Sequence, residues 1–324
     1  MKKVLIGIGN AVTDLSVQTS LSVLEQTGLQ HGGMTLVNFL EAKELLKQIN
    51  PDHQNPGGST ANTLHHLASK NHQTIFIGAI GNDKLGKDFQ KSFEDVGIHF
   101  DPKHCVIDGE NSHFSLICIT PDSERSMGTF INDNLQIQQS MLSSSDLKSA
   151  DYLYLESYLW SHPQSKDTVS AACSQFEGKV ILTLSDQSCV KENFTEIYEF
   201  VSAHTQFVFA NHEEVCALMK TPSIDEAKKK CQEMSQITWV ITEGRFGASI
   251  VSGNQNIHIP AVSVPKVIDK TGAGDLFAAG FIDGLLSGDD LPDCGRKASI
   301  AASQIIQQIG ARLDYSKHQI YHED

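Results

Sequence analysis

The sequence contains no run of apolar residues as long as a membrane-spanning helix, and no long block of charged residues. A transmembrane helix requires about 20 consecutive, mostly apolar residues, so none is expected. Among the 324 residues, 25 are lysine or arginine and 39 are aspartate or glutamate, and the formal net charge is −14. Proteins that bind nucleic acids normally present a basic face to the phosphates. We therefore expect neither a membrane nor a nucleic acid as a partner.

The seven cysteines include no CxxC pair, and their number is odd. A disulfide framework normally uses an even number of cysteines, so reduced thiols and a cytoplasmic location are expected. The first residues, MKKVLIGIGNAVTD, place two lysines before an apolar run, as a signal peptide does. Because Gly9 and Asn10 break this run and Asp14 follows soon after, a buried first strand is the better interpretation.

Several well-known catalytic motifs are missing. There is no GxSxG hydrolase elbow, no HExxH zinc motif and no HRD or DFG element of a protein kinase. The segment VLIGIGNAV begins like the dinucleotide-binding fingerprint GxGxxG, but Val12 occupies the third glycine position. The segment GNDKLGKD resembles a P-loop, but Asp88 replaces the hydroxyl residue that binds Mg²⁺. A Rossmann oxidoreductase and a P-loop enzyme are therefore disfavoured.

Short strand-like segments alternate with helix-like segments along most of the chain. Strands that are apolar on both faces and alternate with helices are typical of a parallel sheet covered on both sides. The sequence therefore predicts an α/β fold, a three-layer α/β/α sandwich with a central, mostly parallel sheet. The predicted strands are 3–9, 74–81, 114–120, 152–157, 179–185, 207–211, 238–244 and 248–253. The predicted helices are 38–48, 60–70, 85–96, 165–176, 212–219, 224–235, 275–287 and 294–308.

Two segments fit this alternation poorly. Residues of about 13–37 and 104–134 are more polar, with scattered glycines and short strand-like pieces. We expect them to form a small β-rich cover over one edge of the main sheet. No linker separates two independent halves of the chain, so residues 1–324 are expected to form a single domain.

Three polar segments each have a structural and a functional interpretation. In NPGGSTANTLHH (55–66), the glycines and Ser/Thr form a turn and a helix N-cap, or they bring the backbone and Asn62 close to a hydroxylated ligand. In NHEE (211–214), the residues form a capping box, or Glu214 lies near a metal–phosphate complex. In TEGRFGAS (242–249), the glycines belong to a hairpin, or they admit a nucleotide against the backbone.

A fourth segment, DKTGAGDLFAAGF (269–281), runs from a glycine-rich turn into a predicted helix. Backbone N–H groups at the start of a helix form a binding site for anions, and the helix dipole strengthens it. The acid Asp275 nevertheless lies within this turn. The negative charge at an anion-binding turn requires an explanation.

In this order along the chain, the motifs resemble those of the PfkB family, the ribokinase-like carbohydrate and nucleoside kinases. The resemblance covers nearly the whole chain. Its most specific element is DxTGAGD, in which Lys270 occupies a position that is more often threonine in the family; this position lies outside the GAGD core. The resemblance rests on GNAVTD (9–14), GGSTAN (57–62), GNDKLG (81–86), NHEE (211–214) and DKTGAGD (269–275).

The resemblance implies a kinase that transfers a phosphoryl group from Mg-ATP to an alcohol, on a ribokinase-like fold whose lid is built from the two irregular segments. It also implies that Asp275 is the base that takes the proton of the acceptor hydroxyl. The implied anion hole is Gly272, Ala273 and Gly274. The implied substrate-binding residues are Asn10, Asp14, Gly57, Gly58 and Asn62. The implied contacts to ATP are Thr242, Gly244 and Gly247. The residues implied to contact Mg²⁺ and the phosphates, directly or through water, are Asn211 and Glu214.

The acid and the anion-binding turn then have separate partners. The backbone of residues 272–274 holds the phosphoryl group, while Asp275 reaches the acceptor hydroxyl beside it. The helix start favours the ionised carboxylate, and a loose phosphoryl-transfer transition state needs little help from a base. Arg125, in the second irregular segment, either adds positive charge over the phosphates or is a solvated side chain. Several family members use a monovalent cation such as K⁺ near this loop. The resemblance leaves open whether this protein uses one.

Within the family, the segments GIGNAVTDL, GGMTLV, YLESYLW and TLSD most resemble the adenosine-kinase branch. This implies the 5′-hydroxyl of adenosine as the acceptor, and hence purine salvage. The candidate walls of an apolar slot for the base are Val12, Met34, Tyr158 and Leu159, each of which is alternatively a plain core residue. A sugar-phosphate acceptor is disfavoured, because the irregular segments contain few basic residues besides Arg125. The acceptor is alternatively another nucleoside or a free sugar such as ribose, and a catalytically idle sensor also remains open. The oligomeric state is open too, as either a monomer or a lid-mediated homodimer.

Overall fold

The structure, a computed structural model, describes residues 2–122 and 124–313. Its centre is an eight-stranded sheet in the order β15-β14-β13-β12-β11-β10-β1-β5. The strands from β13 to β5 run parallel, and β14 and β15 are antiparallel additions at one edge. The prediction of a mostly parallel sheet is confirmed. The strands are β1 (Val4–Ile8), β5 (Gln73–Ile77), β10 (Tyr152–Glu156), β11 (Lys179–Thr183), β12 (Thr205–Asn211), β13 (Thr238–Thr242), β14 (Ala248–Ser252) and β15 (Gln255–Ile259).

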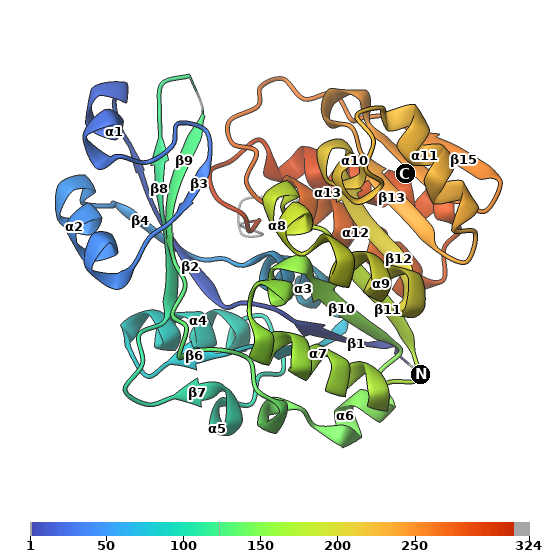
Figure 1. Ribbon diagram of the computed structural model, residues 1–324, viewed down its shortest axis with the longest axis horizontal. Coiled ribbons are helices and arrows are strands. Elements are labelled where there is room, and N and C mark those ends of the chain that lie inside the picture. Colours follow the sequence, from blue (N-terminus) through green and yellow to red (C-terminus); the bar gives the residue numbers. More distant parts are fainter. Residues whose placement is uncertain (1, 123, 314–324) are drawn as a thin grey trace.

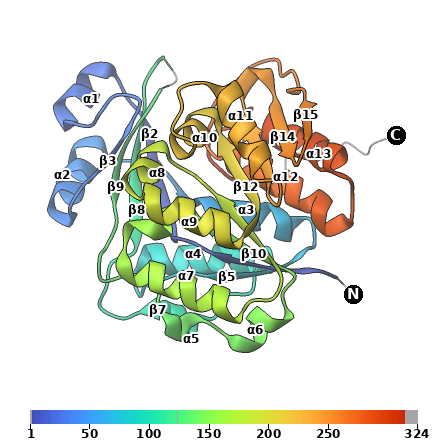
Figure 2. The same ribbon diagram turned by 45° about the vertical axis from the view of Figure 1, so that its right-hand side comes forward.

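Both faces of this sheet are buried, because successive side chains of a strand point to opposite faces. Leu5 and Tyr154 belong to one apolar core, and their neighbours Ile6 and Leu155 belong to the other. Helices cover each face, which completes the predicted three-layer sandwich (Figure 1 and Figure 2). The core of Leu5 is covered by α3 (Ser59–Ser69), α4 (Lys84–Glu94), α12 (Ala273–Ser287) and α13 (Leu291–Ile305). The core of Ile6 is covered by α6 (Ser144–Ser149), α7 (Pro163–Gln175), α8 (Gln187–Glu192), α9 (Phe194–His204), α10 (His212–Leu218) and α11 (Ile224–Glu233).

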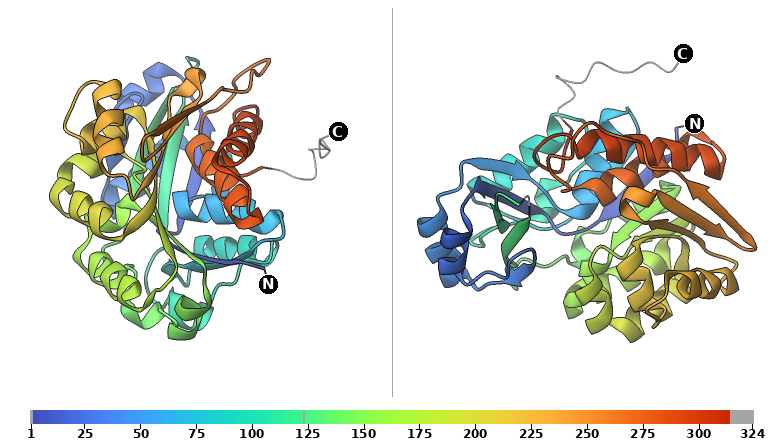
Figure 3. Two further views of the ribbon diagram at one scale, coloured as in Figure 1. Left: turned by 90° about the vertical axis from the view of Figure 1, so that its right-hand side faces the viewer. Right: turned by 90° about the horizontal axis from the view of Figure 1, so that it is seen from above.

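A second sheet, here called the lid sheet, has five strands in the order β3-β9-β8-β2-β4. Seen from above in Figure 3, it projects from one side of the main body together with α1 and α2. Phe114 and Leu116 of the sheet form one apolar cluster with Leu24 of α1 and Leu45 of α2. The elements are β2 (Val12–Gln18), β3 (Met34–Leu36), β4 (His53–Pro56), β8 (His113–Ile119), β9 (Arg125–Phe130), α1 (Leu21–Thr27) and α2 (Phe39–Ile49).

The lid sheet differs from the expected cover in its boundaries. Its strands and helices come from residues 12–56 and 113–130, so α2 and β4 belong to it although the prediction left them out. The reason is that α2 buries its apolar face, including Ala42 and Leu45, against this sheet and not against the main one. Cys105, within the expected cover, lies instead in the core of the main sheet.

Short elements connect these layers. They are β6 (Ile80–Gly81), β7 (Val106–Ile107), α5 (Pro102–Cys105) and the 3₁₀ helices η1 (Gln139–Met141), η2 (Ser157–Ser161) and η3 (Gly244–Phe246). Asp83 caps α4 by accepting a hydrogen bond from Gly86 N (2.8 Å), so GNDKLGKD is a strand-to-helix turn and not a P-loop. In the ranges 2–122 and 124–313, every helix is too short or too polar to serve as a membrane span.

The carboxyl ends of the parallel strands meet at one edge of the main sheet, which is where ligands bind in such folds. The polar residues at these ends are Asn10 after β1, Glu156 in β10, Asp186 after β11, Asn211 in β12 and Thr242 in β13. The lid sheet also contacts the main domain through an ion pair between Arg125 and Asp269, just before α12. Most of the predicted site residues therefore come from this edge or from segments next to it.

Candidate active site

Asp275 lies in the first turn of α12, where it faces helix α3. Its carboxylate accepts hydrogen bonds from Ser59 Oγ (2.7 Å) and from Asn62 Nδ2 (2.9 Å). Its backbone carbonyl accepts a third, from Thr63 Oγ1 (3.2 Å). Residues three or four apart share one face of a helix, so Ser59, Asn62 and Thr63 all face α12. These contacts hold the carboxylate in one orientation.

Burial raises the pKa of Asp275 above its usual value, and the hydrogen bonds from Asn62 and Ser59 and the positive charge of Arg312 oppose this shift. The dipole at the helix start favours the ionised form of this carboxylate. In the structure, desolvation outweighs that effect. A raised pKa makes the carboxylate a better proton acceptor than an exposed aspartate would be.

The turn before α12 presents backbone donors beside this carboxylate. Gly272 caps the helix in the left-handed conformation, with φ of 71°. A Cβ here would lie 2.8 Å from Ala311 Cα, so both the backbone angle and the available space require glycine. In the described part of the chain, the N–H groups of Gly272 and Gly274 meet no protein acceptor, whereas that of Ala273 donates to the Lys270 carbonyl (3.2 Å). Of the predicted anion-hole donors, Gly272 and Gly274 are thus available, and Ala273 is engaged.

Asp14, in β2, belongs to the same electrostatic cluster. Burial raises its pKa to about 7. The arginines that lower this pKa are Arg125 and Arg312, and the carboxylates that raise it further are Asp275 and Asp269. Gly57 lies directly beside Asp14, because a Cβ at Gly57 would approach Asp14 Oδ2 to 2.7 Å. The structure therefore brings Asp14 and Gly57 together as the resemblance implies.

The segment after β1 packs on the loop that precedes α3. Gly57 N donates to the carbonyl of Val12 (2.7 Å). Gly58 has φ of 90°, and a Cβ there would overlap the carbonyl oxygen of Asn10. Only glycine permits both this angle and this close approach. Asn10 and Val12 are consequently held against the start of α3, close to the residues that contact Asp275.

A buried acid, Glu156, holds the start of α3. Its Oε2 accepts a hydrogen bond from Thr60 N (2.9 Å), and its Oε1 accepts one from Asn10 N (2.8 Å). Burial raises the pKa of Glu156 to about 7, and these backbone donors oppose the shift. Ser59 does not cap the helix, because its hydroxyl donates to Asp275. The turn of GGST does begin the helix, with Gly58 as the N-cap, but the predicted side-chain cap by Ser or Thr is wrong.

The capping box predicted for NHEE is confirmed. Glu214 N donates to Asn211 Oδ1 (2.8 Å), and Asn211 N donates to Glu214 Oε2 (2.9 Å). Glu214 is only 5% exposed, and burial raises its pKa to about 7. The negative charges of Asp186, Glu213 and Asp275 raise it further. Glu214 thus caps α10 and also shares an electrostatic field with Asp275.

The negative charges around Glu214 suit a divalent cation. In residues 2–122 and 124–313, no three or more His, Cys, Asp or Glu side chains are grouped to hold a metal by themselves. Mg²⁺ usually takes few protein ligands and keeps several waters. Each carboxylate oxygen of Glu214 accepts one hydrogen bond, from the backbone or side chain of Asn211, and so retains a lone pair. Glu214 therefore fits a Mg²⁺ ion that is held mainly by phosphates and water.

The segment TEGRFGAS connects the antiparallel strands β13 and β14, as the hairpin interpretation predicts. Glu243 N donates to the Gly247 carbonyl and closes the turn (2.8 Å), with Gly244 between them. Thr242 is the register partner of Asn211 in the neighbouring strand β12. The predicted ATP contacts in this turn consequently adjoin the residues predicted for Mg²⁺.

Arg125 is bound at the DKTGAGD turn. Its Nη2 donates to Asp269 Oδ2 (3.0 Å), and the two side chains are 16% and 4% exposed. Asp269 also accepts hydrogen bonds from Thr271 N (2.9 Å), Thr271 Oγ1 (2.7 Å) and Gly310 N (2.8 Å). The interpretation of Arg125 as a solvated side chain is therefore wrong. The structure places the guanidinium on a carboxylate at the turn.

The residues predicted to line an apolar slot lie in different surroundings. Leu159 is 1% exposed within the core of the main sheet, so the plain-core interpretation holds for it. Its neighbour Tyr158 is partly exposed, and burial of its hydroxyl raises the pKa well above the usual value. Met34 is exposed in the lid sheet, and Val12 is partly exposed where β2 begins. Tyr158, Met34 and Val12 keep surface that a ligand can contact.

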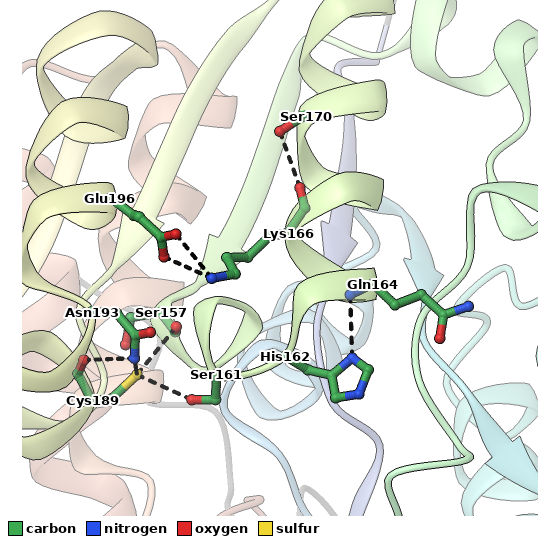
Figure 4. Close-up of polar contacts among 9 residues, drawn as sticks. All are labelled: Ser157, Ser161, His162, Gln164, Lys166, Ser170, Cys189, Asn193 and Glu196. Carbon is green, nitrogen blue, oxygen red and sulfur yellow. Dashed lines mark hydrogen bonds and ion pairs between the residues drawn. The ribbon is translucent and has the colours of Figure 1, made fainter.

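The 3₁₀ helix η2, which carries Tyr158, is fastened to α8. Figure 4 shows Cys189 Sγ of α8 directed at Ser157 and donating to its carbonyl (3.3 Å). In the same view, an ion pair between Lys166 and Glu196 (2.8 Å) joins α7 to α9. The contact of Cys189 with Ser157 thus joins η2 to α8 next to Tyr158.

Four residues belong to this cluster although the sequence did not single them out. Ser59 and Asp269 lie within quoted motifs, and Glu156 is an acid at the end of a predicted strand, so each had a local signal. Arg312 lies beyond α13, outside any motif, and donates from Nε to Asn62 Oδ1 (3.1 Å). Only the folded chain reveals that contact.

A cavity of about 480 Å³ lies at α8 and α10. Its walls include Phe194, Cys216 and Lys220, and none of the residues that contact Asp275. The candidate active site is therefore identified by the convergence of polar groups around Asp275 and not by the size of a cavity.

Comparisons with known proteins identify the family of this chain. The protein-family model described as pfkB family carbohydrate kinase matches residues 34–318. An adenosine kinase of Schizophyllum commune is 25% identical over 341 residues, covering 97% of each chain. The crystal structure of adenosine kinase from Sinorhizobium meliloti is 31% identical, covers 98% of this chain and 97% of its own, and superposes with a TM-score of 0.91. That of a probable sugar kinase protein from Rhizobium etli CFN 42 is 28% identical, covers 96% of each chain and has a TM-score of 0.89.

The family match spans most of the chain, and the structural likeness extends over both the main sheet and the lid sheet. The resemblance inferred from the motifs and the ribokinase-like fold are confirmed. The chain belongs to the pfkB family of carbohydrate kinases, and it is a phosphotransferase that acts on the alcohol group of a small molecule.

Proposed function

We propose that this protein transfers the γ-phosphoryl group of Mg-ATP to the 5′-hydroxyl of a nucleoside, with adenosine as the favoured acceptor. The observation that carries this proposal is the arrangement at the start of α12. The N–H groups of Gly272 and Gly274, which meet no acceptor within residues 2–122 and 124–313, lie within one turn of the Asp275 carboxylate. An anion site and a proton acceptor so close together suit a reaction between a phosphoryl group and a hydroxyl group.

In this reaction, Asp275 takes the proton of the acceptor hydroxyl as the new O–P bond forms, while the bond between the γ-phosphorus and the β–γ bridging oxygen breaks and ADP leaves. The backbone donors of Gly272 and Gly274, with the positive end of the α12 dipole, stabilise the negative charge of the transferring group. Ser59 and Asn62 keep the carboxylate aimed at the acceptor. The transition state is loose, so positioning and charge stabilisation contribute more than the strength of the base.

Glu214 and Asn211 would hold Mg²⁺, directly or through water, next to the phosphates of ATP. When bound, the ion neutralises phosphate charge during transfer. The turn of Thr242, Gly244 and Gly247 would contact ATP, since it adjoins Asn211 in the sheet. A monovalent cation near residues 269–275, as some relatives in the family use, is a further element of the proposal.

Adenosine is favoured because two similar proteins bear the name adenosine kinase, and one of them is similar over nearly its whole length at 31% identity. A free sugar is the second candidate, because the similar Rhizobium etli protein is named a probable sugar kinase. An idle sensor is disfavoured, since binding alone does not require a buried carboxylate beside an anion site. The proposal places the protein in purine salvage in the cytoplasm, as a monomer or as a dimer joined through the lid.

The test is the release of ADP from Mg-ATP with adenosine, inosine, guanosine, ribose and fructose 6-phosphate, each supplied separately. We expect adenosine to give the highest kcat/KM. Faster turnover of ribose would favour the sugar kinase. If no acceptor raises ADP release above the rate without acceptor, the proposed function is wrong.

Removing one hydrogen bond to the catalytic carboxylate should move the pH profile. Ser59 stabilises ionised Asp275, so Ser59→Ala should raise the pKa of that carboxylate. Asp275 would then become protonated at a higher pH. On acidification, the activity of the variant would therefore begin to fall at a higher pH than that of the unchanged protein. A hydrogen bond to a charged group is worth about 1.5–3 kcal/mol, which corresponds to about one pH unit or more. The shift is measured as the acid limb of kcat/KM against pH.

The control for this experiment is Ser69→Ala. Ser69 lies on the same helix, and its hydroxyl donates to the His66 carbonyl and not to Asp275. Its acid limb should coincide with that of the unchanged protein. If the acid limbs of the unchanged protein, Ser59→Ala and Ser69→Ala coincide, Ser59 does not set the pKa of Asp275.

A further inference from the structure

Arg312 reaches the candidate active site from the end of the described chain and is held there by several contacts. Its Nε donates to Asn62 Oδ1 (3.1 Å), and its Nη1 donates to Ser92 Oγ (3.0 Å). Its guanidinium carbon lies 5.7 Å from the ring centre of Phe89 and 5.6 Å from that of Phe93. Arginine stacks well on aromatic rings and presents rigidly directed donors. The guanidinium is thus fixed next to the helix that supports the catalytic carboxylate.

The contact with Asn62 decides which way that amide faces. The oxygen and nitrogen ends of an amide have nearly the same size, so hydrogen-bond partners determine the orientation. Arg312 can only donate, so it selects the amide oxygen and turns the NH₂ group of Asn62 toward Asp275 Oδ2 (2.9 Å). A continuous chain of hydrogen bonds therefore runs from Arg312 through Asn62 to the base.

We propose that Arg312 is a positioning residue for phosphoryl transfer, because it fixes the orientation in which Asn62 donates to Asp275 and thereby aims the base at the acceptor. This inference rests on the proposed function, since it assigns Asp275 the role of the base. Arg312 does not itself need to contact the reacting atoms.

The electrostatics of the cluster support this role. Burial raises the pKa values of Asp14 and Asp275, and the charge of Arg312 lowers both. The other titratable groups whose charge interacts with Asp275 are Asp14 of β2, Tyr154 and Glu156 of β10, and Glu214 of α10. Arg312 is therefore a cation that offsets the negative charges of Asp14 and Asp275.

The cost of this arrangement also points to a function. In the described part of the chain, Nη2 of Arg312 is buried and meets no hydrogen-bond partner. A buried donor without an acceptor lowers stability. Packing alone would be served better by an apolar side chain against Phe89 and Phe93. The unpaired donor is explained if Arg312 is retained for its effect on the site.

The first test replaces Arg312 by methionine, which keeps an unbranched side chain near the two rings and removes the donors and the charge. We expect kcat to fall by about 10–100-fold, because small displacements of reacting groups have effects of this size. KM for ATP should change less than about twofold, because Arg312 acts on the acceptor side. The matched control is Arg296→Met at an exposed arginine of α13, which should keep full activity. An unchanged kcat in Arg312→Met would overturn the inference.

A second measurement separates positioning through Asn62 from a general loss of structure. In an Asn62→Ala background, Arg312→Met should lower kcat by less than about twofold, since the link is already broken. Loss by the same factor in both backgrounds would overturn the inference. If Arg312→Met does not fold, Arg312→Lys replaces it, because lysine keeps the charge but lacks the fixed Nε donor. An unimpaired kcat in Arg312→Lys would also count against the inference.

A third measurement does not depend on turnover. In protein labelled with ¹³C at aspartate carboxyl groups, the signal of Asp275 is assigned by its absence in Asp275→Asn. Its titration midpoint should rise by about half a pH unit or more in Arg312→Met and stay unchanged in Arg296→Met. A raised midpoint in a protein that phosphorylates no acceptor would refute the proposed function and leave the link from Arg312 to Asp275 standing. An unchanged midpoint would refute the link.

Discussion

Replacing Asp275 by asparagine is expected to lower kcat by about 10²–10⁴-fold, which is the usual contribution of general base catalysis. Asparagine keeps the size of the side chain and cannot take the proton of the acceptor. Ser59 and Asn62, which donate to the carboxylate, can still be paired with the amide because a serine hydroxyl both donates and accepts. KM for the acceptor should therefore change little. Steady-state kinetics with the best acceptor measures both constants.

The same substitution should not weaken the fold. Burial raises the pKa of Asp275, which means that the charged form is disfavoured in the native protein, and a neutral amide avoids that cost. The midpoint of thermal unfolding should stay equal or rise. Asp283→Asn, on the same helix, is the control: it removes the carboxylate charge that faces His72 (2.6 Å) and Lys297 (3.6 Å), so it should lower stability and leave kcat intact. Full activity in Asp275→Asn would contradict the mechanism.

The main sheet was predictable from sequence because its strands are apolar on both faces. Every predicted strand overlaps a strand of the structure, as 152–157 does with β10, and every predicted helix overlaps a helix. Strand β15 was missed, because it lies at the edge of the sheet and its sequence QNIHI is mostly exposed. Helices α8 and α9 were missed between two strands that were recognised. Local patterns are thus strongest where both faces are buried.

The extent of the lid sheet was not predictable. Helix α2 has a clear apolar face, but the sequence does not say which surface that face covers. The structure places Leu45 and Ile49 against the lid sheet. The pairing of β2 with β8 likewise joins segments separated by about 100 residues, Val12 with His113. Such long-range pairings depend on the whole fold and leave little local signal.

In the candidate site, too, some residues could be predicted from short segments and others could not. Asp275, Asn62 and Glu214 could be named from motifs, because their spacing within short segments is specific. The local interpretation of Ser59 as a cap failed because its partner is 216 residues away. The contact between Arg312 and Asn62 joins positions 250 residues apart. Motifs identify groups that carry chemistry, whereas the residues that orient those groups come from distant segments.

The second large effect is expected from Gly272→Ala. Gly272 has φ of 71°, and a Cβ there would lie 2.8 Å from Ala311 Cα. Alanine in this left-handed conformation costs about 1–2 kcal/mol, and the contact forces the turn to move. The N–H groups of Gly272 and Gly274 then no longer point at the phosphoryl group. One oxyanion-hole donor is typically worth about 10²–10³-fold in kcat. We therefore expect a loss of this size, measured at saturating acceptor and Mg-ATP.

Helix α12 provides its own control, because it also ends with a glycine in the left-handed conformation. Gly288 has φ of 88°, and a Cβ there would meet no atom within 4 Å. Gly288→Ala therefore imposes the same kind of backbone strain without disturbing the turn before Asp275. Both variants should unfold at lower temperature, and only Gly272→Ala should lose kcat. If the two variants lose activity equally, the turn has no special role, since strain anywhere in the helix would then account for the loss.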